Sequence, residues 1–181
     1  MLASLRTYFF EKEKKKRIGE RRVQSPGFRR NRKNHYGLLV DASNPDDRAI
    51  ITAFGEELRR EGNRVKILGY VDGKIETLAL SFDVFTSLDL AKFSKVPNSP
   101  KVETFINQTF DILINLSIKE NHKALEYISA VSKAAFRVGP WYEQQNQNPY
   151  DLCVDAGKTG SLKEWINELM RTLQKIDYTD K

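Results

Sequence analysis

Basic side chains gather near the N-terminal end of the chain, where they could bind the phosphates of a polyanion. Residues 1–35 hold 12 of the 30 Lys and Arg residues but only three of the 24 acidic residues, a net charge of +9. Residues 36–181 carry a net charge of −3. This asymmetry indicates a nucleic acid or an anionic membrane as the partner of the basic segment. The predicted nucleic-acid-binding residues are Lys14, Lys15, Lys16, Arg17, Arg21, Arg22, Arg29, Arg30, Arg32 and Lys33.

Apolar and aromatic residues are interleaved with these cations, and they leave three interpretations open. With RNA as the partner, the cations contact phosphates while aromatic rings stack on bases. With a membrane as the partner, apolar side chains of residues 2–10 insert and residues 12–17 meet anionic headgroups. With no partner, a helix docks the stripe formed by Leu2, Leu5 and Phe9 on the rest of the protein, and its charges stay in water. The aromatic residues of this segment are Tyr8, Phe9, Phe10, Phe28 and Tyr36.

A second group of polar residues follows three apolar runs that are typical of buried strands. In an open parallel sheet, ligands bind beyond the C-terminal ends of the strands, where the strand order reverses. Small-ligand binding or catalysis at such a crevice competes with a simpler interpretation, in which these residues only cap helices and close loops. The predicted crevice residues are Asp41, Ser43, Asn44, Asn115, Ser117, Lys119 and Trp141.

The same sequence argues against several kinds of chemistry. The first strand–helix turn, residues 41–47, contains no glycine and includes Pro45 and two further carboxylates, which disfavours a phosphate-binding loop or a dinucleotide site. The two histidines, His35 and His122, lie far apart without metal-ligand spacing, and we expect each to face solvent or cap a helix. We therefore expect no metal, no cofactor and no catalytic residue, and we favour a non-enzymatic protein.

The elements that must position these residues alternate between strands and helices. Strands are expected near residues 36–42, 65–71, 110–116, 136–139 and 150–155, and short strands are possible within 78–85 and 93–96. Helices are expected at 2–24, 44–62, 100–108, from Asn121 onward, and from Ser161 onward. This alternation predicts a Rossmann-like or flavodoxin-like α/β fold, with a mostly parallel, doubly wound sheet of five or six strands. Antiparallel pairing stays open for the C-terminal strands.

The domain organisation predicted from this pattern is a basic helical arm with its linker, residues 1–35, followed by one α/β domain, residues 36–181. No apolar run approaches the roughly 20 residues needed to span a bilayer, so we expect no transmembrane segment. The single cysteine, Cys153, suits a reducing compartment, and we expect a cytoplasmic protein.

Three segments carry a resemblance to a known family: residues 41–43 (Asp-Ala-Ser), residues 110–117 and residues 135–139. With them, the chain resembles an uncharacterised bacterial family of small α/β proteins with a basic N-terminal helix. The resemblance covers most of the chain and supports the α/β fold, but it implies no activity and no site residues.

Function is therefore predicted from charge. We expect a non-enzymatic adaptor whose basic arm binds RNA, in a setting such as the ribosome or its assembly. The alternatives are a peripheral membrane protein and a small-ligand-binding or enzymatic domain that uses the strand-end crevice.

Overall fold

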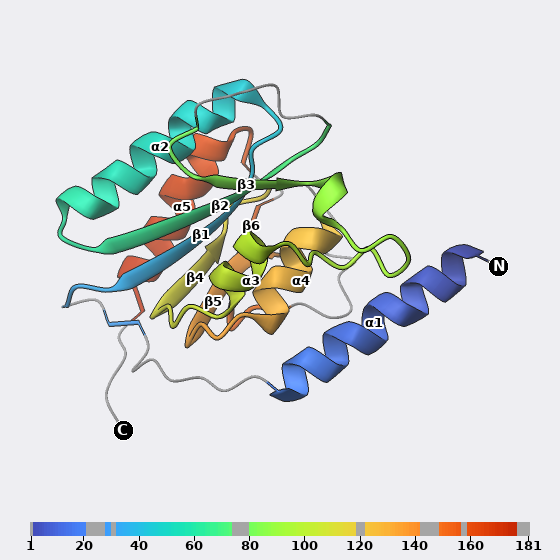
Figure 1. Ribbon diagram of the computed structural model, residues 1–181. Helices are drawn as coiled ribbons and strands as arrows, with labels where there is room; N and C mark the ends of the chain where they lie inside the picture. Colours follow the sequence, from blue (N-terminus) through green and yellow to red (C-terminus); the bar gives the residue numbers. More distant parts are fainter. Residues whose placement is uncertain are drawn as a thin grey trace.

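A six-stranded, all-parallel sheet forms the centre of the protein (Figure 1). The computed structural model describes residues 2–20, 28–29, 32–73, 80–118, 122–141, 149–156 and 159–176. The strand order is β3-β2-β1-β4-β5-β6, which is the Rossmann order, with the reversal between β1 and β4. The strands are β1 (His35–Asp41), β2 (Arg64–Val71), β3 (Asp83–Thr86), β4 (Ile112–Asn115), β5 (Phe136–Trp141) and β6 (Leu152–Asp155).

Helices cover both faces of this sheet, which confirms the predicted doubly wound α/β fold (Figure 1). One hydrophobic core lies between the sheet and the helices α2 and α5. The other lies between the sheet and α3 and α4, and α1 packs on its outer side. The helices are α1 (Leu2–Glu20), α2 (Pro45–Arg60), the 3₁₀ helix η1 (Ser87–Asp89), α3 (Pro100–Ile106), α4 (Lys123–Val131) and α5 (Leu162–Gln174).

The start of α2 has the chemistry that its sequence predicts. The Asn44 side chain accepts a hydrogen bond from the backbone N–H of Asp46, and Pro45 occupies the first helical turn. At the other end of the helix, Gly62 adopts a φ of 86°. A glycine tolerates this left-handed conformation, and it lets the chain turn directly into β2.

The expectations for two segments need correction, and parts of two others fall outside the described residues. The pairing of β5 with β6 is parallel, so antiparallel C-terminal strands were a wrong alternative. Residues 92–94 form a turn, and the pairing that the described residues show here is an isolated bridge between Leu90 and Pro97, so 93–96 is not a strand. Of the helix expected at 2–24, residues 21–24 lie outside the described residues, as does the proposed cap Asn121. Helix α4 begins at Lys123, and His122 stands at its N-cap position.

Helix α1 is attached to the body through a different residue from the one its spacing suggests. Phe10 is only 8% exposed and packs on the Tyr127 ring of α4, with 5.5 Å between ring centroids. The Arg17 guanidinium donates two hydrogen bonds to the Glu103 carboxylate, at 2.6 and 2.8 Å. Leu5 and Phe9, which were expected on the buried stripe, are substantially exposed. Helix α1 therefore docks on the body, but its anchor is Phe10 and not the expected stripe.

Candidate functional site

A groove separates the docked helix α1 from the body, and cations from three segments line it. We call this cavity of about 220 Å³ the basic groove. Helix α1 contributes Arg6 and Lys14, the 92–95 turn contributes Lys95, and the first residue of α4 contributes Lys123. Docking of α1 therefore adds body lysines to the cations of the arm. The remaining lining residues are Thr7, Phe10, Glu11, Ser94, Glu126 and Tyr127.

Two carboxylates moderate the charge of the basic groove. Glu11 forms an ion pair with Lys14 at 2.8 Å, one turn along the same helix. Glu126 is half-buried, and this burial raises the pKa of its carboxyl above the ordinary value. Lys14 and Lys123 lower that pKa, whereas the negative charge of Glu11 adds to the increase. As the pH falls, Glu126 is therefore protonated earlier than an exposed glutamate would be, and the groove loses this negative charge.

The predicted nucleic-acid-binding residues of α1 are not equivalent. Lys15 and Lys16 are exposed, and Lys14 is half-buried at the groove. Arg17 is held by Glu103, and this hydrogen bond is the main reason that the pKa of Arg17 is raised. Arg21, Arg22 and Arg30 lie outside the described residues. Within α1, Lys14, Lys15 and Lys16 are therefore better placed than Arg17 to meet a partner.

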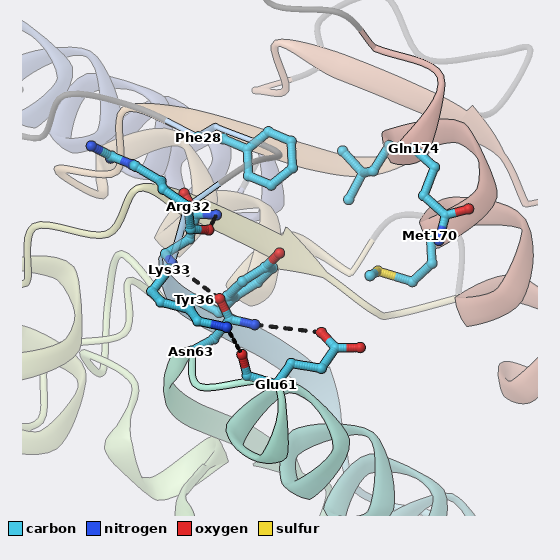
Figure 2. A pocket seen from close by; sticks show the side chains of 10 residues that line it. Phe28, Arg32, Lys33, Tyr36, Glu61, Asn63, Met170 and Gln174 are labelled. Atoms are coloured by element: carbon cyan, nitrogen blue, oxygen red, sulfur yellow. Dashed lines mark hydrogen bonds between the residues drawn. The ribbon is translucent and has the colours of Figure 1, made fainter.

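Two described cations of the second predicted cluster, in the linker, contact the body (Figure 2). Arg29 is exposed, but Arg32 donates to the Asp111 carboxylate at 2.8 Å. The Lys33 amine points to the turn after α2 and donates to the backbone carbonyl of Glu61. These contacts fix the linker beside a cavity of about 310 Å³ at the N-terminal ends of the strands. Two of the four linker cations thus have a structural role.

The strand-end crevice also exists, with a volume of about 390 Å³. Asp41, Ser43 and Asn44 line it from the β1 side, and Ser117 lines it from the β4 side. The Ser43 hydroxyl donates to the Asp41 carboxylate at 2.6 Å and accepts from the backbone N–H of Asp72 at 2.9 Å. The further lining residues are Asp47, Leu116, Ile118 and Leu162.

Two of the predicted crevice residues, Asn115 and Trp141, do not line this cavity. Asn115 is buried and donates from its amide to the Tyr150 hydroxyl at 2.6 Å, so it holds the sheet together below the crevice. Trp141 is 41% exposed at the end of β5. Lys119 lies outside the described residues.

His122 is a feature of the crevice region that the sequence did not reveal. Its side chain is only 10% exposed, its Nε2 atom lies 3.9 Å from Oδ2 of Asp41, and its ring contacts Tyr70. It occupies the N-cap position of α4, as one of the two expected alternatives has it, but its side chain makes no capping bond there, and the solvent-facing alternative is wrong. In a serine hydrolase the histidine lies between serine and aspartate. Here Asp41 lies between Ser43 and His122, so the imidazole is not placed to activate the hydroxyl.

Two further kinds of site are not formed by the described part of the chain. No group of three or more His, Cys, Asp or Glu side chains there could hold a metal ion. Among the helices formed by the described residues, none has the length and apolar character that a membrane crossing requires.

The fold and its surfaces define an α/β protein of Rossmann strand order whose N-terminal helix builds a basic groove on the body. The chain belongs to the family of unknown function DUF6913, whose model matches residues 6–176. That match includes both most of α1 and the whole sheet. No curated protein matches the sequence.

Proposed function

We propose that the protein is a non-enzymatic binding protein that contacts RNA through its basic N-terminal segment. The observation that carries the proposal is the basic groove, in which Arg6 and Lys14 of α1 face Lys95 and Lys123 of the body. In this proposal residues 1–35 remain the RNA-binding segment, and residues 36–181 form the domain that carries it. Cations on two sides of a groove can follow the phosphates of one strand, and this is the main source of affinity for nucleic acids.

Contacts of α1 favour RNA over a membrane as the partner. Insertion into a bilayer would use the apolar side chains of residues 2–10. Phe10 is already buried against Tyr127, and Phe9 contacts the Phe93 ring at 5.0 Å. The helix would have to leave the body to insert both rings. Phosphate binding needs no such change, because Lys12, Lys15 and Lys16 are exposed while the helix is docked.

The test is a salt titration of RNA binding by the full chain. We expect the triple variant Lys14→Gln, Lys95→Gln, Lys123→Gln to bind an unstructured RNA more weakly than the wild type. The slope of log K against log salt should fall by about 2, because each lost phosphate contact to a single strand contributes about 0.7. A matched control changes three exposed cations outside the groove, Arg60, Lys163 and Lys175, to Gln. Equal losses in both triple variants would refute the groove as the binding site.

A second candidate function has support from the strand-end crevice. Its cavity lies at the switch point of the sheet, where the Asp41 carboxylate is fixed by Ser43 and faces His122. This arrangement favours a small ligand that donates hydrogen bonds. A thermal-shift screen with nucleotides, sugar nucleotides and amines tests it, with Asp41→Asn as the site variant. If no compound raises the melting temperature of the wild type, this candidate fails.

A further inference from the structure

Three exposed aromatic rings form a continuous series beside the basic groove. Tyr8, Phe9 and Phe93 are 59%, 38% and 47% exposed. Tyr8 contacts Phe9 edge to face with 5.5 Å between ring centroids, and Phe9 contacts Phe93 in the same way at 5.0 Å. We call these three residues the aromatic platform. Their mutual contacts hold large apolar rings in place at the surface, where water would otherwise favour their burial.

The residues of the aromatic platform are sequence neighbours of residues that line the basic groove. Phe93 is followed directly by Ser94 and Lys95, which line the groove, and Tyr8 follows Thr7, which also lines it. Lys12 lies one helical turn beyond Tyr8 and Phe9 and is exposed. Aromatic rings and cations therefore alternate across the junction between α1 and the 92–95 turn.

We propose that the aromatic platform stacks on unpaired bases of the RNA whose phosphates lie in the basic groove. This inference rests on the proposed RNA-binding function and names single-stranded RNA as its target. Stacking on an exposed ring needs a free base face, which a duplex offers only at its ends. Cations beside the rings select a polyanion over a neutral apolar partner, so the charge of the junction favours RNA over a protein surface.

Single-ring variants of the full-length protein test this inference. We expect Tyr8→Leu and Phe93→Leu each to weaken binding of an unstructured 12-nucleotide RNA by about tenfold, within the range of one base–aromatic stack. The salt slope should stay unchanged, because no charge is removed. Affinity for a blunt duplex of the same length should change less than twofold. Trp141→Leu removes a ring that is 41% exposed at the end of β5 and serves as the matched control. Tyr8→Trp keeps an aromatic ring at this position and should retain binding.

The outcomes separate this inference from the proposed function. If wild-type protein binds neither RNA in a salt-dependent way, the proposed function and this inference fail together. If wild-type protein binds both RNAs and the ring variants bind them equally well, only the aromatic platform is overturned. Vesicles of neutral lipid with one-fifth phosphatidylserine provide the membrane comparison. Pelleting that depends on Tyr8 and Phe93, with RNA binding unaffected by them, would also overturn the inference.

Discussion

Replacement of Phe10 by Ala should disturb the geometry of the basic groove while every charged residue of the groove is kept. Phe10 is 8% exposed and is the ring of α1 that packs on Tyr127. Burial of a Phe side chain contributes about 1.5–3 kcal/mol, so loss of the ring should weaken docking of α1 by about 2–3 kcal/mol. That change corresponds to roughly 30- to 150-fold in the docking equilibrium. All 30 Lys and Arg residues of the chain are retained in this variant.

Amide hydrogen exchange of α1 measures this loss directly, because most of the stability of a helix in a folded protein comes from its tertiary packing. We expect protection of α1 to fall by the factor above while protection of the central strands is kept. The RNA affinity should fall with the fraction of α1 that stays docked. If α1 loses its protection and RNA binding is unchanged, the arm acts as a free tether and the groove is irrelevant. If α1 keeps its protection, Phe10 is not the anchor.

Three further predictions concern the contacts around α1 and the sheet. A double-mutant cycle of Arg17→Ala with Glu103→Ala, measured by urea unfolding, should give a coupling energy of about 1 kcal/mol, because the ion pair is bidentate but partly exposed. If the two substitutions have additive effects on stability, this ion pair does not hold α1 on the body. The pKa of Glu126 is raised, so this carboxylate loses its negative charge earlier as the pH falls, and RNA affinity should then rise. Glu126→Gln should raise RNA affinity and make it depend less on pH. A pH profile of RNA binding that the variant leaves unchanged would show that Glu126 does not oppose RNA in the groove. Gly139→Ala places a methyl group against the Tyr150 ring, and the overpacking should cost about 1–3 kcal/mol of stability, which a drop in melting temperature checks. An unaltered melting temperature would contradict this packing of Tyr150 on Gly139.

Local chemistry was enough to predict most of the fold. The apolar run at 110–116 predicts β4, and Asn44 with Pro45 predicts the start of α2, because these signals act within a few residues. The parallel pairing of β6 was not predictable in this way. Tyr150, which precedes β6, packs over Gly139 of β5, and this contact between the two segments exists only in the folded chain.

The candidate sites were harder to predict, because distant segments build them. Charge in residues 1–35 predicts a polyanion partner, but Lys95 and Lys123 carry no local sign that they will face α1. Helical spacing favoured a buried stripe through Phe9, whereas Phe10 is the residue that docks. The spacing was a poor guide because α1 is only weakly amphipathic, so its sequence does not mark one docking face. His122 joins Asp41 only because the start of α4 lies beside the end of β1.

Photo-crosslinking of the full-length protein to a single-stranded RNA that contains 4-thiouridine tests the central claim most directly. Mass spectrometry then identifies the crosslinked peptides. We predict that crosslinks concentrate in residues 6–16, in the 92–95 turn and at the start of α4, and that they disappear as salt is raised. Crosslinks confined to other surfaces, or no crosslinks at low salt, would contradict the account.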